Sequence, residues 1–236
     1  ASFALLVMVF IPELSYASGG TRLWLQFGFF SFQPSEALKL SFVIYLASWL
    51  DSPRTKMTSI SYGMLPFAIM VSIVGVFLVM QQDIGTLGVI IATAGLMYFF
   101  GGGKISQIAV LAGMLLVAFL ILIQLAPYRM DRLKVFLNPG IEPRGIGYQI
   151  NQAFIAIGSG GFWGRGFGQS MQKYNYLPEP MGDSVFAIFA EEMGFLGSLI
   201  LIGAFLFFLW RGFRISKRAP DVFGKLLAAG LITSIV

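Results

Sequence analysis

The sequence has 236 residues, of which 57% are hydrophobic and 11% are charged, and its mean hydropathy is +0.80. A water-soluble domain of this length could not bury so much apolar surface, so the composition predicts a protein embedded in lipid. The absence of cysteine and histidine excludes disulfides, thiolate or imidazole metal sites, and a Cys or His base. The formal charge of +5 favours anionic partners, first of all lipid headgroups.

Seven apolar segments read as membrane helices or parts of them, since a spanning helix needs about 20 residues. They are 1–12, 37–50 (longer if residues 34–36 form its first turn), 60–80, 84–100, 105–126, 185–210 and 222–236. Because backbone in lipid must satisfy its own hydrogen bonds, the predicted fold class is all-α, a polytopic transmembrane helical bundle. We treat 1–236 as one transmembrane domain and expect it to be a fragment, because it begins and ends inside apolar segments.

The connections between these segments alternate between the two sides of the membrane. One side receives 51–58, 101–104 and 211–221. These connections hold seven Lys or Arg against two Asp, so the positive-inside rule makes that side cytoplasmic. The other side, which faces out, receives 13–33, 81–83 and 127–183.

The segment 127–183 is the large predicted extracytoplasmic loop. Its prolines and closely spaced glycines indicate turns, and residues 148–157 are apolar enough for a short interfacial or re-entrant helix. A long loop with this much predicted shape is usually functional. We therefore expect any chemistry of the protein to lie here.

The loop retains cations on the side where the positive-inside rule disfavours them. They are Arg129, Arg132, Lys134, Arg144, Arg165 and Lys173, interleaved with the aromatic residues Tyr128, Tyr148, Phe154, Trp163 and Tyr174. A solvated face with interfacial aromatics is the ordinary explanation. Arginine and glycine-rich backbone also bind phosphate, so a lipid that bears a pyrophosphate would explain both charge and location. Nucleic acid would not explain the location.

Asp183 stands at the end of the loop, just before an apolar segment enters the membrane. Aspartate is a favoured N-cap, and its charge suits the positive end of a helix. A carboxylate at the membrane surface could equally act as a general base toward an attacking hydroxyl. The two roles are compatible, and both stay open.

Glu191 and Glu192 follow on the same predicted helix. Glu191 lies about 12 Å beyond Asp183 at 1.5 Å per residue, which is too far for a carboxylate dyad. Ionisable groups inside a bilayer are costly and normally face the bundle interior. A structural partner is the favoured role, and a proton or ion relay is the alternative.

A second polar group precedes and begins the segment 37–50. Ser35 could cap that helix with Glu36 in its first turn. Lys39 lies about one turn from Glu36 on the same face, so the two can pair. With Arg22 they suggest the wall of a polar cavity, whereas Asp83 is more simply the cap of the following helix.

Several of these stretches carry a family resemblance. They are 20–24 (Gly-Thr-Arg-Leu-Trp), 33–36 with Lys39 (Gln-Pro-Ser-Glu), 82–86 (Gln-Asp-Ile-Gly-Thr) and a long pattern over 132–194. In this order they resemble the SEDS family (shape, elongation, division and sporulation proteins) along essentially the whole chain. Residues 168–179, Gly-Gln-Ser-x-Gln-Lys-Tyr-x-Tyr-Leu-Pro-Glu, look closer to the division member FtsW than to the elongation member RodA.

The resemblance implies a ten-helix fold, of which this chain holds roughly the middle. It implies a peptidoglycan glycosyltransferase of the inverting type in the bacterial cytoplasmic (inner) membrane, with its active site facing outward. The enzyme would polymerise lipid II during cell division and release undecaprenyl pyrophosphate. Its expected partners are lipid II, a class B penicillin-binding protein transpeptidase, other divisome proteins and membrane lipids, with no nucleic acid.

The resemblance also assigns site residues. The family's essential outer-loop aspartate falls on Asp183, as the base that deprotonates the acceptor hydroxyl. The candidates for substrate binding are Arg22, Glu36, Lys39, Arg132, Gln152, Lys173 and Glu179. Structural or relay roles fall to Asp83, Glu191 and Glu192. A divalent cation, Mg²⁺ or Mn²⁺, could assist the leaving group, and no organic cofactor is expected.

The sequence departs from the family's usual pattern at two places, and two other functions remain open. The family's usual Thr-Asp-Phe reads Gly182-Asp183-Ser184 here, and its usual Gln-Pro-Asp reads Gln-Gln-Asp at 81–83. A transporter (flippase) of a lipid-linked precursor would use Lys39, Glu191 and Glu192 as its intramembrane polar path. A division scaffold would use the loop only to bind partners.

Overall fold

The computed structural model describes residues 2–11, 15–18, 21–27, 30–53, 55, 57–125, 130–131, 134–135, 137–138, 140, 145, 147–174 and 182–236. The contacts divide the chain into two compact units. Unit 1 consists of Ala1–Gly113 and Phe208–Val236, and unit 2 is Met114–Phe207. The prediction of a single domain over 1–236 stays a prediction, and each unit is described below by itself.

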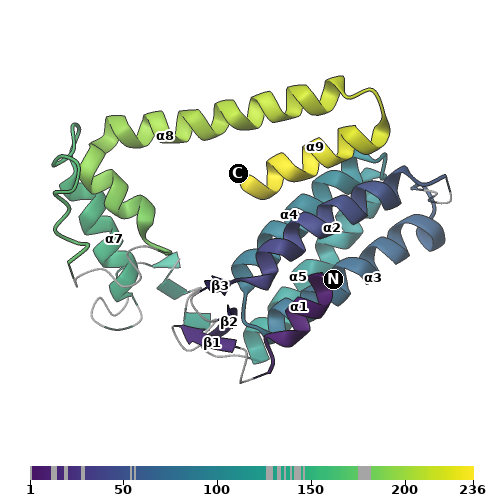
Figure 1. Ribbon diagram of the computed structural model, residues 1–236, viewed down its shortest axis with the longest axis horizontal. Coiled ribbons are helices and arrows are strands. Elements are labelled where there is room, and N and C mark those ends of the chain that lie inside the picture. Colours follow the sequence, from purple (N-terminus) through teal and green to yellow (C-terminus); the bar gives the residue numbers. More distant parts are fainter. Residues whose placement is uncertain are drawn as a thin grey trace. The chain divides into compact units, whose positions relative to one another are not determined.

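Unit 1 is mainly helical (Figure 1). Its elements are α1 (Ser2–Met8), α2 (Pro34–Asp51), the π-helical turn η1 (Ile60–Met64), α3 (Leu65–Met80), α4 (Ile84–Phe100), the first part of α5 (Ile105–Leu125), the last part of α8 (Val185–Arg218), and α9 (Val222–Ile235). The observed α4 has the predicted limits, and Pro34–Glu36 does form the first turn of α2. The predicted helical class is confirmed.

Helices α2, α4 and α9 pack against one another along the core of unit 1. Close approach is possible because α9 carries a glycine there: a Cβ on Gly230 would overlap Met97 of α4 and Val43 of α2. Small residues at such crossings are typical of membrane helices, whose association depends on packing rather than on the hydrophobic effect. The buried Tyr98 hydroxyl donates to Gln107 Oε1 at 3.0 Å, which satisfies a polar group inside this core.

Three helices of the described residues are long and apolar enough to cross a membrane: Ile60–Met80, Ile105–Gln124 and Val185–Arg218. Ile84–Phe100 and Val222–Ile235 are shorter apolar helices. Large apolar side chains cover the outside of these helices, as on Ile69, Val117 and Leu206. A surface of this kind is stable only in contact with lipid or with further helices.

A small antiparallel sheet lies between α1 and α2 in the chain, where the sequence predicted only a connection. It has the order β1 (Ser15–Ser18), β2 (Thr21–Phe27) and β3 (Phe30–Phe32). Along β2, Leu25 is buried whereas Trp24 and Gln26 on the opposite face are exposed, which is the period of two of a half-buried strand. Strand β2 contacts α2, so the sheet joins the beginning of that helix.

Of the two helix caps predicted in unit 1, Asp83 is confirmed and Ser35 is not. Asp83 Oδ1 accepts from Thr86 N at 3.0 Å, so Asp83 caps α4 as predicted. Its other oxygen accepts from Gln33 Nε2 at 3.4 Å. The predicted Ser35 cap is wrong, because α2 begins one residue earlier at Pro34, which suits the first helical position. Ser35 is buried instead within the first turn.

Unit 2 contains the rest of α5, the helix α7 (Tyr148–Ser159) and the first part of α8. The short helix predicted for residues 148–157 is thus confirmed, with two further residues. Ala156 of α7 packs against Ala187 of α8, and Gln149 Nε2 donates to Ser184 Oγ at 3.4 Å. Small side chains therefore bring α7 close to the beginning of α8.

Candidate functional site

Helix α8 is broken at Gly194, whose φ of 68° and ψ of −168° are not helical. In a continuous helix, Phe195 N and Leu196 N would donate to the carbonyls of Glu191 and Glu192, four residues earlier. The glycine-rich loop 160–174 forms hydrogen bonds with these two N–H groups and two carbonyls instead. Four backbone bonds of 2.9 to 3.2 Å run from Arg165 N to Glu191 O, from Gly166 N to Glu192 O, from Phe195 N to Gly161 O and from Leu196 N to Phe162 O.

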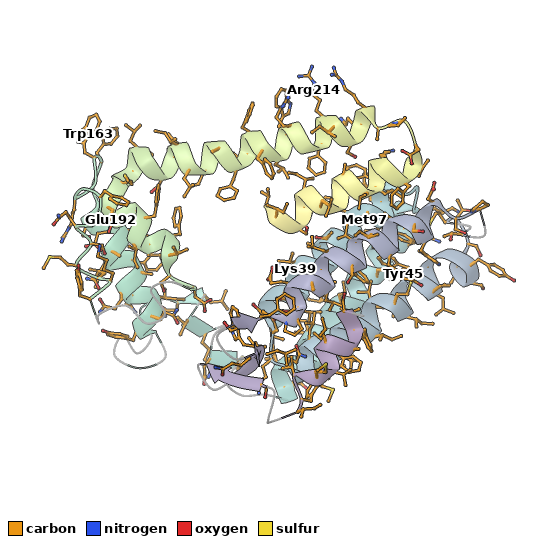
Figure 2. All side chains as sticks on the ribbon, viewed as in Figure 1. Lys39, Tyr45, Met97, Trp163, Glu192 and Arg214 are labelled. Carbon is orange, nitrogen blue, oxygen red and sulfur yellow. The ribbon has the colours of Figure 1, made fainter. Side chains whose placement is uncertain are left out.

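The loop thus replaces the hydrogen bonds that the helix loses at its break. Non-helical backbone near a membrane is tolerated only where other protein groups satisfy it, and the loop supplies these groups. We call this arrangement the loop clamp: residues 160–174 held against the break of α8. Figure 2 shows Trp163 at the tip of the loop and Glu192 on α8 beneath it.

Two glycines make the loop clamp possible. Gly164 has a φ of 81° and Gly194 a φ of 68°, which L-residues with a side chain rarely adopt. A Cβ on Gly164 would overlap Glu192 O, and a Cβ on Gly194 would overlap Gly164 N. Both the backbone conformation and the available space therefore require glycine at these positions.

Glu191 holds the loop from inside. Its side chain is 1% exposed and accepts hydrogen bonds from Ser170 Oγ at 2.6 Å, Met171 N at 3.2 Å and Gln172 N at 3.3 Å. Arg165 Nη1 lies 3.5 Å from Glu191 Oε1, the oxygen that also accepts from Met171 N. A buried carboxylate is costly unless it is paired and hydrogen-bonded, and these donors meet that condition.

Glu192 fixes the same loop at a second point. Its Oε1 lies 2.9 Å from Lys173 Nζ and accepts from Ser170 N at 3.4 Å. Lys173 Nζ also donates to Gly168 O at 2.6 Å. This geometry favours the structural role of both glutamates over the relay, because loop groups already occupy their carboxylates.

Replacing Glu191 by glutamine should loosen the loop more than replacing Glu192. Glutamine keeps one acceptor but turns an amide donor toward backbone N–H groups, and hydrogen bonds to a buried charge are worth about 1.5–3 kcal/mol each. We expect faster tryptic cleavage after Arg165 and Lys173 in E191Q, and a smaller increase in E192Q, whose carboxylate is less buried. Equal rates in the wild-type protein and in E191Q would contradict the loop clamp.

The uncharged part of α8 begins after these two glutamates. Helix α8 has 34 residues in two parts, one on either side of the break at Gly194. The uncharged run 195–210 covers about 24 Å and ends at Trp210. Glu191 and Glu192 stand before this run and before the break at Gly194, outside the uncharged part of the helix.

Asp183 is exposed in the turn 182–184, directly before α8, whereas Ser184 of the same turn is buried. Helix α8 begins at Val185, and Ser184 O accepts from Ala187 N and Ile188 N, so Ser184 holds the N-cap position. Ser184, and not Asp183 as predicted, is therefore the N-cap residue of α8. The carboxylate of Asp183 is left on the surface near the positive end of a helix.

The other candidates divide between the two units. In unit 2, Gln152 is half-buried on α7, and Lys173 belongs to the loop clamp. Arg132 and Glu179 lie outside the described residues. In unit 1, Arg22 lies on β2, where its backbone pairs with Ala17.

Glu36 and Lys39 of unit 1 form the predicted pair, with Lys39 Nζ 2.9 Å from Glu36 Oε1. Lys39 is mostly buried and lines a small cavity between α2, α4 and α9. Thr93 Oγ1 and Ser234 also border this cavity. Within the described part of the chain, Thr93 Oγ1 is buried without a hydrogen-bond partner. The cavity is therefore lined in part by polar atoms, although it lies inside the helical bundle.

The loop and α7 present large apolar side chains to the outside. Trp163 is 77% exposed and Phe167 is 83% exposed. Phe154, Met171 and Tyr174 are exposed as well. Because the loop is tied to the point where the apolar run of α8 begins, these side chains lie where interfacial aromatics are expected.

No group of three or more Asp or Glu that could hold a metal ion occurs among the residues described above. Asp183 in particular stands apart from the two glutamates, whose oxygens bind loop donors. The assistance of Mg²⁺ or Mn²⁺ therefore stays a prediction.

Several apolar helices, one of them broken at a glycine and clamped by a loop, define a polytopic membrane protein. Residues 1–236 match the family model of the FtsW/RodA/SpoVE cell cycle proteins. The chain belongs to this family, which the sequence resemblance named as SEDS.

Relatives of the chain carry the names of two branches of the family. The chain is 41% identical over 233 residues to the stage V sporulation protein E of Bacillus subtilis, covering 99% of this chain and 64% of the relative. It is 37% identical over 231 residues to a probable peptidoglycan glycosyltransferase FtsW of Trichlorobacter lovleyi, covering 98% and 60%. The chain therefore spans about three fifths of the length of these relatives, and the preference for the division branch stays a prediction.

Solved structures confirm the fold. One, described as the structural coordination of polymerization and crosslinking by a peptidoglycan synthase complex, has a TM-score of 0.76 at 24% identity and covers 99% of this chain and 64% of its own. The rod shape determining protein RodA of Thermus thermophilus has a TM-score of 0.64 at 24% identity, covering 99% and 60%.

Sequence reasoning missed the loop clamp. The available signal was the coincidence of six glycines within 158–168 and a Glu-Glu pair shortly before Gly194. A paired carboxylate followed by a glycine inside an apolar helix is unusual, since glycine weakens a helix and charge is costly there. Neither observation, however, identifies the partner segment.

Proposed function

We propose that the full-length protein is a peptidoglycan glycosyltransferase that polymerises lipid II at the outer face of the cytoplasmic membrane during cell division. Membership of the family and the names of the FtsW relatives support this proposal. The single observation that carries it is the exposed Asp183 at the beginning of a membrane helix, whose later part holds the loop clamp. A water-exposed carboxylate at that level can reach the headgroup of a lipid-linked sugar.

In the proposed reaction, Asp183 accepts the proton of the acceptor sugar hydroxyl while that oxygen attacks the anomeric carbon of the donor. The new glycosidic C–O bond forms as the bond from that carbon to the pyrophosphate oxygen breaks. Undecaprenyl pyrophosphate leaves with the electron pair, and attack from the opposite face inverts the configuration. A positioned base of this kind contributes about 10²–10⁴ to the rate.

The loop clamp has a supporting role in this proposal. Glu191 and Glu192 neutralise Arg165 and Lys173 and hold the loop in one conformation, so its exposed groups are ordered before substrate arrives. Lys173 uses two of its three donors on Glu192 and Gly168, and the third would serve the pyrophosphate. The exposed Trp163 and Phe167 would hold the loop at the lipid surface.

The partners follow from the same reasoning. A structure with the same fold belongs to a complex described as coordinating polymerization and crosslinking. We propose that the full-length protein acts with a class B penicillin-binding protein, which supplies the transpeptidase, and with other divisome proteins. Lipid II is the proposed substrate, and the location is the inner membrane with the site facing outward.

Polymerisation in detergent separates this function from the transporter. A flippase needs two membrane faces, whereas a polymerase can form glycosidic bonds in mixed micelles that hold purified full-length protein and lipid II. We expect glycan strands, seen as a ladder on a gel, without any bilayer. If no strands form but labelled lipid II crosses proteoliposome membranes, the transporter is the correct function.

The occupied carboxylates of Glu191 and Glu192 favour the enzyme over the transporter, because a relay needs groups that can exchange protons along a path. The assistance of Mg²⁺ or Mn²⁺ stays a prediction. A titration of the same polymerisation assay with chelator and with each ion measures whether the rate depends on it.

A further inference from the structure

Helix α8 continues for eight residues beyond the end of its apolar run, through Arg211–Arg218. The run 195–210 has no charged residue and ends at Trp210, which is 53% exposed. Tryptophan is enriched at the membrane–water interface, so Trp210 marks where the helix leaves the hydrocarbon. The residues that follow therefore lie at the level of the lipid headgroups.

One side of this extension is packed against the rest of unit 1. A Cβ on Gly212 would overlap Ile232 of α9, and the Phe213 ring lies 5.8 Å from that of Phe100. The buried Ser216 Oγ donates to Lys225 O at 2.7 Å, which ties the extension to α9. The extension is thus held in a fixed orientation.

The opposite side carries four cations. Arg211, Arg214, Lys217 and Arg218 are all exposed, and at 3.6 residues per turn they fall within an arc of about 120°. None of the ion pairs in the part of the chain that the structure describes includes any of them. Figure 2 shows Arg214 on the side of α8 that faces away from α9.

Arg214 of this face also contacts Trp210, the residue that marks the membrane–water interface. Its guanidinium carbon lies 5.3 Å from the centre of the Trp210 ring, a cation–π contact. The contact holds the charge at the depth of the tryptophan, next to the hydrocarbon. Arginine in this position can donate two parallel hydrogen bonds to a phosphate group.

We propose that Arg211, Arg214, Lys217 and Arg218 form a binding face for the phosphate groups of anionic phospholipids. Four cations fixed on one side of a helix that leaves the membrane match a layer of phosphates in charge and in level. A phospholipid fits better than an acidic protein, because Trp210 places the face at the membrane surface itself. The inference is independent of the proposed enzymatic function.

Lipid selectivity in proteoliposomes measures this binding. The full-length protein is placed in phosphatidylcholine bilayers, and the association of spin-labelled phosphatidylglycerol is compared with that of spin-labelled phosphatidylcholine. The protein should prefer phosphatidylglycerol, and R214Q/K217Q should reduce the preference by at least about twofold, because each cation near the surface adds to lipid attraction. The matched control K104Q/K225Q removes the same charge from the same side of unit 1 but outside this face, and should reduce the preference clearly less.

Two results would overturn the proposal: an equal loss in both double variants, or no loss in R214Q/K217Q. A salt titration of the wild-type protein needs no variant and so avoids any folding defect. Raising the salt from about 0.05 to 0.5 M should abolish most of the preference, since the screening length falls from above 10 Å toward 3 Å. A preference that persists at high salt would also overturn the proposal.

Discussion

Full-length protein that carries D183N is expected to lose at least about 99% of its polymerisation rate. Asparagine has the shape of aspartate but cannot accept the proton of the attacking hydroxyl, and a positioned general base is worth about 10²–10⁴ in rate. Because Ser184 rather than Asp183 holds the N-cap of α8, the substitution should leave the helix start intact. The rate is measured as lipid II consumed by the purified protein in detergent.

Two controls accompany this prediction. The affinity of D183N for lipid II should stay within about threefold of that of the wild-type protein. The interaction that the substitution removes stabilises the transition state and not the bound substrate. D221N alters another exposed aspartate that precedes a membrane helix, α9, and should leave the rate unchanged. If D183N and D221N have the same rate, Asp183 is not the base.

The second large effect is expected at the break of α8. In G194A, a methyl group would overlap Gly164 N, and the residue would keep a φ of 68° that costs about 1–3 kcal/mol without glycine. We expect G194A to lose the loop clamp, and with it most of the polymerisation, although it lies far along the helix from Asp183. The loss should appear as rapid tryptic cleavage in the loop.

G158A is the matched control for this prediction. Gly158 is an exposed residue of α7 with no atom within 4 Å of an added Cβ. The substitution to alanine is favourable in a helix by about 1 kcal/mol, so G158A should have wild-type activity and normal resistance to trypsin. An active, protease-resistant G194A would show that the break of α8 is not needed.

The membrane helices could be predicted because long apolar runs have no other stable structure in lipid. The limits of α4 agree with the prediction, and α7 differs by two residues. Helix α8 extends to Arg218 although its apolar run ends at Trp210. Arginine and lysine are good helix formers, so the charged residues after Trp210 end the apolar run while the helix continues.

The sheet was not predicted because residues 13–33 were considered only as a connection. The alternation in Thr21–Phe27 was present in the sequence, but it is short and its partners are short strands. The helix break was hidden for a different reason: its compensation comes from Gly161–Gly166, about thirty residues earlier in the chain. Such long-range pairing leaves no local pattern.

Sequence reasoning predicted the Glu36–Lys39 pair, which the structure shows at 2.9 Å, whereas the role of Asp183 stays a prediction. It also favoured a structural role for Glu191 and Glu192, which agrees with their contacts. It could not tell that Lys173 is held by Glu192, because that contact depends on how the loop folds.

The most direct test of the central claim compares the products of wild-type protein and D183N in the same detergent assay with labelled lipid II. The proposed function predicts a ladder of glycan strands from the wild-type protein, and only unreacted but bound lipid II with D183N. A ladder of equal strength from both proteins would contradict the role of Asp183. No ladder from a correctly folded wild-type protein, alone or with its transpeptidase partner, would contradict the polymerase itself.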